Sequence, residues 1–278
     1  MTAAVRAGVD DPPPTTPRRS TALHIIVCIK SVVTAAPRGR LVRTAENSAL
    51  NPFDRPVLAT ALSLKERHGG SVTALSMGPP AAEETLREAL AIGADRAVLL
   101  CDPALAGGDT LATAAALSAG AAFLAPFDLL LFGARSSDSD TGQVGPQTAV
   151  LLDLPMVTGV TAIDVAGQEV TVERKMDDFL ERYTLTVPAA LAVHPAAAAP
   201  RDAALGGLAA AFDELTVETL DIGKLGLDAA TVGDAGSPTR VLSTQQVKKD
   251  RACEWIEGSP AEQAERLVQK LAAQGLIG

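Results

Sequence analysis

Aromatic side chains are scarce in this chain: of its 278 residues, 3% are Phe, Tyr or Trp. Hydrophobic residues nevertheless make up 47% of the sequence, which is enough for a large core. Ala, Leu and Val must build that core, and their side chains suit helices that pack closely on a sheet. The length fits one large domain, or one domain with an extension.

Cysteine, basic charge and long apolar runs are also lacking. Cys28, Cys101 and Cys253 lie far apart and form no CxxC motif, which favours reduced thiols over a disulfide framework. The net charge of −9 argues against nucleic acid as the main partner, because phosphate backbones require a basic face. No apolar run reaches the length of a membrane span, and we expect a cytoplasmic, bacterial protein without a transmembrane segment.

Motifs of bond-breaking chemistry are absent as well. The sequence contains no GxxxxGK[ST] phosphate loop, GxSxG elbow, HExxH pair or GxGxxG fingerprint. Its three histidines, His24, His68 and His194, fall at a strand start, a helix end and a strand end, where structural roles are expected. We therefore expect neither catalytic nor metal-ligating residues, and a place for a nucleotide instead.

Strand patterns and helix patterns alternate over the first half of the chain. Apolar runs predict strands over residues 23–29, 72–77, 97–101 and 127–133. Helical spacing predicts helices over residues 54–68, 81–92, 109–124 and 147–152, and an irregular segment over 31–50. Such a series predicts an α/β, Rossmann-like fold: a parallel sheet with helices on both faces and right-handed crossovers.

The second half has a different pattern. Residues 156–165 and 168–176 predict an antiparallel hairpin, and residues 182–193 one further strand. A linker at 195–200 and a segment without a long periodic element at 201–258 follow, until the capping box Ser259-Pro260-Ala261-Glu262 starts a helix to about residue 273. We expect a disordered tail (1–21), an α/β domain (22–196) and a C-terminal arm (197–278) that wraps a partner or the first domain.

One loop between a predicted strand and a predicted helix stands out, at residues 136–146. Small hydroxyl residues, Asp and Gly at the start of a helix leave free backbone N–H groups that converge on an anion. The carboxyl ends of parallel strands are also where open α/β sheets bind ligands. The alternative is a polar loop in which Asp138 and Asp140 serve only as turn and capping residues.

With these elements placed, the chain resembles the β subunit of electron transfer flavoprotein from about residue 23 to residue 278. The similarity rests on short matching segments that occur in a consistent order. They are Val27-Cys28-Ile29-Lys30, Asn51-Pro52-Phe53-Asp54, Ser76-Met77-Gly78-Pro79-Pro80, residues 86–97, 107–114 and 138–146, and shorter matches at 172–174, 187–189, 200–201 and 236–239.

The resemblance implies a site for an adenine nucleotide. Cys28 and Met77 would line the adenine pocket, which Asn51, Pro52, Phe53 and Asp54 would border. As simpler alternatives, these residues would be core and turn residues. The phosphate would lie in a cradle of backbone N–H groups, with Thr141, Gln143 and Val144 nearest. That loop consists of Arg135, Ser136, Ser137, Asp138, Ser139, Asp140, Thr141, Gly142, Gln143, Val144, Gly145 and Pro146.

Two departures from the family pattern affect this loop and its neighbour. Arg135 and Ser139 stand where the family usually has Gln and Gly, and a position with φ > 0 would disfavour Ser139. The segment after Lys30 is shorter than usual, in a region that lies near the β-subunit flavin of bifurcating relatives.

The resemblance implies a heterodimeric electron carrier. Its partners would be an electron transfer flavoprotein α subunit and acyl-CoA or other flavin dehydrogenases, with Leu205 on an exposed loop that docks the dehydrogenase. Its cofactors would be FAD in the heterodimer, and AMP or a second FAD in this subunit; residues 210–213 and 236–241 favour the branch with a second FAD, which NADH reduces.

Two other functions are compatible with the strand–helix series. A stand-alone nucleotide-binding regulator of the universal-stress-protein type would have no use for residues 197–278. An adenylating enzyme would need a Gly-rich loop after the first strand, which residues 31–40 do not supply. The long arm therefore favours the electron carrier.

Overall fold

The computed structural model describes residues 22–34, 44–243 and 253–277, so the expected tail at 1–21 lies outside the described residues. The chain divides into two compact units, Met1–Arg240 and Val241–Gly278. We expected the first domain to end at residue 196, whereas the first unit continues to Arg240. The elements between residues 197 and 240 therefore belong to the same unit as the sheet.

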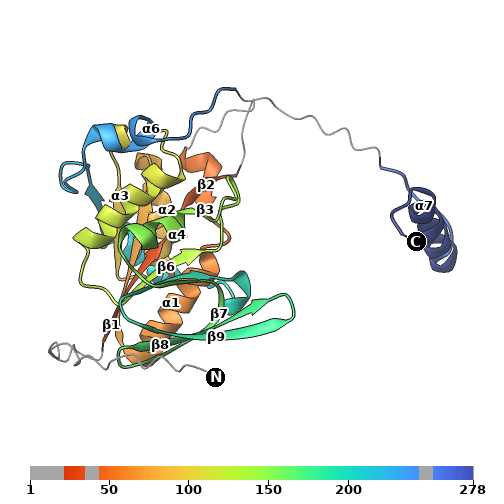
Figure 1. Cartoon of the computed structure of the whole chain (residues 1–278), viewed down its shortest axis with the longest axis horizontal. Coiled ribbons are helices and arrows are strands. Elements are labelled where there is room, and N and C mark those ends of the chain that lie inside the picture. Colours follow the sequence, from red (N-terminus) through yellow and green to blue (C-terminus); the bar gives the residue numbers. More distant parts are fainter. Residues whose placement is uncertain (1–21, 35–43, 244–252, 278) are drawn as a thin grey trace, which may run out of the picture. The chain divides into compact units, whose positions relative to one another are not determined.

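A nine-stranded sheet with the order β11-β5-β4-β1-β6-β10-β7-β8-β9 forms the centre of the first unit (Figure 1). Its parallel part confirms the predicted α/β series. The four predicted strands are β1 (Leu23–Cys28), β4 (Gly70–Met77), β5 (Arg96–Leu100) and β6 (Leu129–Gly133). Strands β1 and β6 consist almost entirely of buried apolar residues, because helices cover both of their faces.

The helices lie on opposite faces of this sheet. Helix α1 (Arg55–His68) and α2 (Glu83–Ile92) pack in one hydrophobic cluster with Ile25 and Leu131. Helix α3 (Thr110–Phe123) and α4 (Val144–Leu151) pack in a second cluster with Ile26 and Leu130. Short 3-10 turns precede α2 at Pro80–Ala82 and α3 at Pro103–Leu105. Helix α4 begins three residues earlier than predicted, at Val144.

The predicted hairpin is confirmed by β7 (Met156–Ala166) and β8 (Glu169–Met176), which pair antiparallel. The single strand predicted over 182–193 is wrong. The chain forms β9 (Phe179–Thr186), antiparallel to β8, and then β10 (Ala189–Val193), which lies between β6 and β7. Pro188 separates the two strands, since it has no N–H group to donate to a ladder.

Two segments predicted to be irregular contain regular elements. Strand β2 (Ser31–Val33) pairs antiparallel with β3 (Ser48–Leu50), which the 3-10 turn Ala45–Asn47 precedes; residues 35–43 lie outside the described residues. After a 3-10 turn at Pro195–Ala197, where Ala197 packs against the core, helix α5 (Leu205–Asp213) and strand β11 (Val217–Leu220) follow. Strand β11 pairs with β5 and so forms one edge of the sheet.

Residues 229–239 return to the start of α3. The 3-10 turn Ala229–Thr231 and helix α6 (Gly233–Gly236) bring Ser237 and Thr239 to Asp109. The Asp109 N–H donates to Ser237 Oγ (2.8 Å), and the Asp109 carboxylate accepts from the Thr239 N–H (3.0 Å) and from the first turn of α3. Bonds from backbone N–H groups, that of Ala112 above all, lower the pKa of Asp109.

The second unit contains helix α7 (Pro260–Ala273), as the capping box predicts. The Ser259 hydroxyl accepts a hydrogen bond from the Glu262 N–H, and the Glu262 carboxylate accepts one from the Ser259 N–H (2.8 Å). Apolar side chains of this unit remain exposed, among them Trp255, Leu267 and Val268.

Candidate functional site

The candidate site lies at the carboxyl ends of three neighbouring strands, β1, β4 and β6, which end at Cys28, Met77 and Gly133. Cys28 is buried and packs in the cluster under α3 and α4, against which Met77 packs partly exposed. Burial, and next the nearby Asp54 carboxylate, raise the pKa of the Cys28 thiol. The thiol is therefore held protonated, which fits a packing role and not that of a nucleophile.

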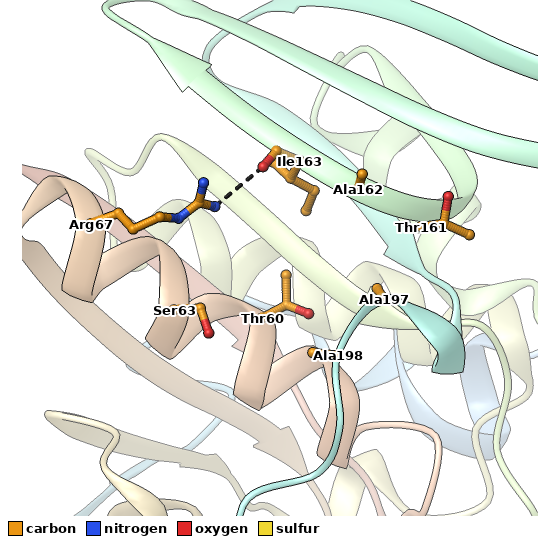
Figure 2. A pocket seen from close by; sticks show the side chains of 8 residues that line it. All are labelled: Thr60, Ser63, Arg67, Thr161, Ala162, Ile163, Ala197 and Ala198. Atoms are coloured by element: carbon orange, nitrogen blue, oxygen red, sulfur yellow. Dashed lines mark hydrogen bonds between the residues drawn. The ribbon is translucent and has the colours of Figure 1, made fainter.

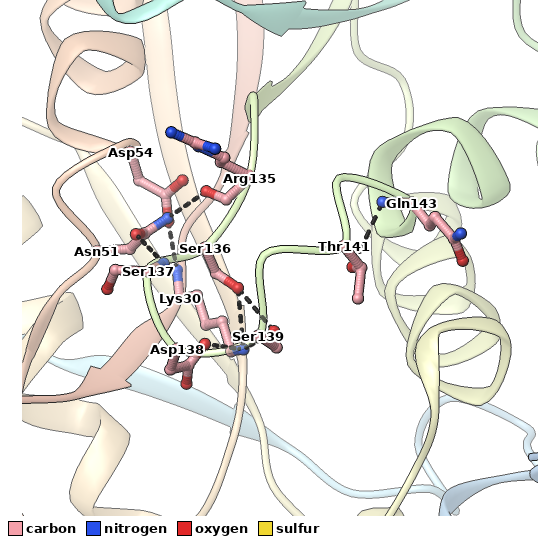
Figure 3. A network of polar contacts seen from close by, with 10 residues as sticks. All are labelled: Lys30, Asn51, Asp54, Arg135, Ser136, Ser137, Asp138, Ser139, Thr141 and Gln143. Atoms are coloured by element: carbon pink, nitrogen blue, oxygen red, sulfur yellow. Dashed lines mark hydrogen bonds and ion pairs between the residues drawn. The ribbon is translucent and has the colours of Figure 1, made fainter. Parts of the chain in front are cut away.

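Asn51 joins the turn before α1 to the loop after β6 (Figure 3). Its side-chain Nδ2 donates to the Arg135 carbonyl (2.9 Å), and its Oδ1 accepts from the Ser137 N–H (3.2 Å). The Asn51 side chain is 1% exposed, and its backbone N–H donates to the Lys30 carbonyl (3.0 Å). A single buried amide thus fixes the backbone of the loop on both sides of Ser136.

Asp54 is a buried carboxylate between β1, β6 and α1. Its Oδ2 accepts from the Lys30 backbone N–H (2.8 Å), and it does not cap α1 with its side chain. Gly133 approaches it so closely that a Cβ there would lie 2.1 Å from Asp54 Oδ1. Burial raises the pKa of Asp54 to about 7, although the Lys30 N–H, the Asn51 side chain and the Lys30 charge lower it.

Lys30 is the residue of this site that sequence reasoning missed. Its Nζ donates to Asp138 Oδ1 (2.6 Å), Ser139 Oγ (3.1 Å) and Ser136 Oγ (3.3 Å) (Figure 3). Asp138 lies in a turn, as the simpler alternative has it, but its carboxylate also forms an ion pair across 108 positions of sequence. The available signal was a lysine directly after a buried strand, together with a loop rich in hydroxyl and carboxylate groups after another.

Arg135 opens the loop and contacts two of the other expected residues. Its guanidinium carbon lies 4.7 Å from the centre of the Phe53 ring, and its Nη1 lies 3.3 Å from Asp140 Oδ1. Ser139 does not have a positive φ; in this loop the positive φ angles belong to Asp140 (54°) and Gly142 (62°). Ser139 is therefore compatible with the loop, and its hydroxyl lies 2.8 Å from that of Ser136.

The other end of the loop leads into α4. The Gln143 N–H approaches Thr141 Oγ1 (3.5 Å), and Thr110 Oγ1 donates to Gln143 Oε1 (3.4 Å). In the first turn of a helix the N–H groups have no intrahelical acceptor. Pro146 has no N–H group, so it leaves no donor unsatisfied there. Gly145 lets this turn approach the sheet, since a Cβ there would lie 3.1 Å from the Phe132 ring.

Most of the expected site residues therefore come together. Asn51, Phe53, Asp54 and the loop from Arg135 to Asp140 form one contact network, whereas Pro52 is exposed beside it. Residues 141–143 lead into α4, and Val144, Gly145 and Pro146 form its first turn. Cys28 and Met77 lie at strand ends, and Cys28 is close enough to Asp54 for that carboxylate to raise the pKa of its thiol. Lysine, hydroxyl and N–H donors around a glycine-containing loop fit the oxygens of a phosphate group.

Leu205 does not belong to this network. It is 87% exposed, as expected, but it is the first residue of helix α5 and not part of a loop. Leu208 and Phe212 of the same helix are also exposed.

A cavity of about 220 Å³ opens between α1 and β7, away from the residues of the network (Figure 2). Its polar side chains are engaged within the fold: Thr60 donates to the Pro56 carbonyl, Ser63 to the Ala59 carbonyl and Arg67 to the Ile163 carbonyl. The other lining residues are Thr161, Ala162, Ala197 and Ala198. Satisfied hydroxyl groups and small apolar side chains offer little to recognise a ligand.

In the part of the chain that the structure describes, no three His, Cys, Asp or Glu side chains are placed to hold a metal ion. Within the same ranges, no helix is long and apolar enough to cross a membrane.

Comparison with known proteins identifies the family. The model of the electron transfer flavoprotein domain matches residues 39–220. The chain belongs to the electron transfer flavoprotein family. Within it, the chain is a β subunit: it is 38% identical over 261 residues to the electron transfer flavoprotein subunit beta of Thermoanaerobacterium thermosaccharolyticum, covering 92% of this chain and 100% of that relative.

Relatives with other names occur at similar identity. Protein FixA of Azorhizobium caulinodans is 37% identical over 86% of this chain and 92% of its own length. Subunit CarD of the caffeyl-CoA reductase–Etf complex of Acetobacterium woodii is 36% identical over 92% of this chain and all of its own length. The resemblance seen in the sequence is confirmed by these matches.

Proposed function

We propose that this β subunit binds an adenine nucleotide at the carboxyl ends of β1, β4 and β6, and that it carries electrons as part of a heterodimer with an electron transfer flavoprotein α subunit. The observation that carries the proposal is the fixing of loop 135–140 from two sides, by the Asn51 amide and the Lys30 ammonium. A loop held in this way is preorganised, so that binding costs little ordering entropy.

The chain's own residues would bind and orient the nucleotide, without breaking bonds. The N–H groups of the loop and of the first α4 turn would hold the phosphate, and Cys28, Met77 and the turn 51–54 would enclose the adenine. A flavin supplies the redox chemistry when bound, by accepting and releasing electrons. Three thiols without a disulfide among them suit the reducing bacterial cytoplasm.

For the nucleotide in this subunit we favour a second FAD over AMP, and reduction of that flavin by NADH. The residues at 210–213 and 236–241 support this choice, and so do relatives whose names connect them with reductases: CarD, and the acryloyl-CoA reductase electron transfer subunit gamma of Anaerotignum propionicum. AMP as a structural ligand is the second candidate, favoured by the short segment after Lys30.

For the outer partner we propose an acyl-CoA or other flavin dehydrogenase that docks on Leu205. A side chain that is 87% exposed at the first position of a helix can enter a pocket of a partner without any rearrangement. The matches to electron transfer flavoprotein β subunits leave the stand-alone regulator of the universal-stress-protein type without support, since such a regulator would neither need an α subunit nor retain a flavin.

Co-expression with a candidate α subunit tests the proposal. The purified heterodimer is extracted with acid, and the released FAD and AMP are counted per heterodimer by chromatography. Two FAD and no AMP are expected, whereas one FAD with one AMP would establish the second candidate. A stable complex that releases one FAD and no further adenine nucleotide would contradict a nucleotide site in this chain.

A further inference from the structure

Asp54 borders the proposed adenine pocket, but its contacts lead to the loop proposed for the phosphate (Figure 3). Asp54 is 4% exposed, and its Oδ2 accepts the Lys30 N–H at 2.8 Å. Its own N–H donates to the Asn51 carbonyl at 2.9 Å. Asp54 therefore contacts both of the residues, Lys30 and Asn51, that hold the loop 135–140 in place.

The Asp54 carboxylate is enclosed between the ends of two strands. Gly133, the last residue of β6, comes so close that a Cβ there would lie 2.1 Å from Asp54 Oδ1. The backbone of Lys30, which follows β1, lies against the other oxygen. A negative charge on Asp54 is therefore held where the loop begins, with little water to screen it from an anion on the loop.

Three titratable side chains act on Asp54 or are acted on by it: the Cys28 thiol at the end of β1, the Lys30 ammonium after it, and the Asp138 carboxylate in the loop. The Cys28 thiol is protonated and carries no charge, because burial raises its pKa. The Lys30 charge favours the ionised form of Asp54, and the Asp138 charge opposes it.

Two arginines next to these segments are engaged with other partners. Arg55, in the first turn of α1, forms an ion pair with Glu88 of α2. Arg135 stacks on Phe53 and lies 3.3 Å from Asp140 Oδ1. Burial therefore outweighs the nearby positive charge of Lys30, and it raises the pKa of Asp54 to about 7.

A phosphate on the loop would add a further negative charge close to Asp54. A like charge disfavours the ionised form of a buried carboxyl group, so the phosphate would promote protonation of Asp54. The coupling is reciprocal: a protonated Asp54 would favour the phosphate to the same extent.

We propose that Asp54 takes up a proton when an anionic nucleotide binds, so that proton binding and phosphate binding favour each other. The proton comes from solvent and neutralises the carboxylate. The inference rests on the proposed nucleotide site. It differs from a purely structural role of Asp54, in which its charge would not affect the affinity for an anion.

The test uses the heterodimer after removal of the nucleotide from this subunit, with titration calorimetry at pH 6, 7 and 8. The charged probe is the methyl ester of AMP, whose phosphate keeps a constant charge over this range. Adenosine is the uncharged probe. Thermal melting at each pH shows that every protein is folded.

The test variant is Asp54→Asn, which keeps the size of the side chain and an acceptor for the Lys30 N–H. Asp95→Asn is the matched control. Asp95 Oδ2 likewise accepts a backbone N–H, that of Val72, at 2.8 Å, but its side chain is 41% exposed and lies elsewhere in the fold.

The wild type is expected to bind the charged probe about fivefold more weakly at pH 8 than at pH 6, because Asp54 ionises between these values. Binding at pH 7 should take up about 0.4 proton, measured from the dependence of the binding heat on the ionisation heat of the buffer. Asp54→Asn should bind with equal affinity at all three pH values and without proton uptake. Asp95→Asn should behave like the wild type, and adenosine should show no pH dependence.

A wild-type affinity for the charged probe that does not change with pH would overturn the inference, and so would a pH dependence that persists in Asp54→Asn. An equal pH dependence for adenosine would overturn it in favour of a structural effect on the pocket; this comparison is made on the wild type and needs no variant. A wild-type heterodimer that binds neither probe nor FAD in this subunit would instead refute the proposed nucleotide site, and the inference with it.

Discussion

The Asp54 carboxylate accepts a hydrogen bond from the Lys30 backbone N–H at 2.8 Å, and this contact ties the start of α1 to the end of β1. The same carboxylate is 4% exposed and lies against Gly133 at the end of β6. One acidic side chain therefore fixes the relative positions of the segments that support the candidate site.

The first prediction concerns pH and stability through Asp54. Burial raises its folded pKa to about 7 from an ordinary value of 3.8, so the folded state holds a proton that the unfolded state has lost between these values. This contribution to stability is fully present below pH 3.8. As pH rises toward 7, it lowers the free energy of unfolding by up to about 4 kcal/mol. Denaturant unfolding of the heterodimer from pH 4 to 8 should show a decline that Asp54→Asn lacks; equal slopes in both proteins would refute it.

The second prediction concerns Asn51. Asn51→Ala leaves the Arg135 carbonyl and the Ser137 N–H without their partner, which should cost about 1–3 kcal/mol of stability and much of the nucleotide content. Asn51→Asp is the harsher variant: it keeps an acceptor for Ser137 but loses the donor to Arg135 and adds a buried charge beside Asp54, so a larger loss than in Asn51→Ala is expected. Nucleotide per heterodimer is the measurement, and a full complement in Asn51→Ala would speak against a role of this amide.

The third prediction concerns the close approach at Gly133. A methyl group there collides with Asp54 Oδ1, so Gly133→Ala should destabilise the fold by about 1–3 kcal/mol. Gly206→Ala is the control, because a Cβ at that helix position meets nothing within 4 Å and should be neutral or slightly stabilising. Unfolding midpoints decide the outcome, and equal stability of the two variants would show that the site relaxes freely.

The fourth prediction concerns Leu205. Leu205→Ala should slow electron transfer from the partner dehydrogenase by about tenfold, the loss expected for a contact near a hot-spot centre, without changing flavin content. Val150→Ala is the control, since Val150 is 78% exposed on a different helix. Stopped-flow reduction measures the rate, and an unchanged rate in Leu205→Ala would exclude this docking role.

The fifth prediction concerns the second unit. The chain has a single tryptophan, Trp255, which is 89% exposed. If residues 253–277 contact the α subunit, assembly should bury the indole and shift its fluorescence to shorter wavelength. A heterodimer with Trp255→Phe gives the signal of the α subunit for subtraction, and an unshifted difference spectrum would place Trp255 outside the interface.

The parallel half of the fold follows from the sequence because β1 and β6 are apolar on both faces and glycines end α1 and α2. The division of residues 182–193 was missed because no glycine or turn motif lies between the two strands, and only Val187 and Pro188 separate β9 from the apolar, buried β10. Strand β11 was missed because its four residues include Glu218, and its pairing with β5 arises from tertiary contact.

The candidate site was predictable in its location and less so in its internal contacts. The motif pattern placed Asn51, Asp54 and the loop correctly together, since strand ends in a parallel sheet meet at one edge. The contact between Lys30 and Asp138 was not predicted, because no local sequence rule pairs residues 108 positions apart. The positive φ was expected at Ser139 and lies at Asp140 and Gly142, because a glycine in related chains does not show which residue of the loop adopts the positive φ.

Positions 54 and 133 occupy one shared volume, although they lie on different elements: the carboxylate at one fills the space that a side chain at the other would need. We therefore expect them to be inherited as a pair. Among related sequences, a residue larger than glycine at position 133 should be found together with a shorter side chain at position 54, and divergence at either position alone should be rare.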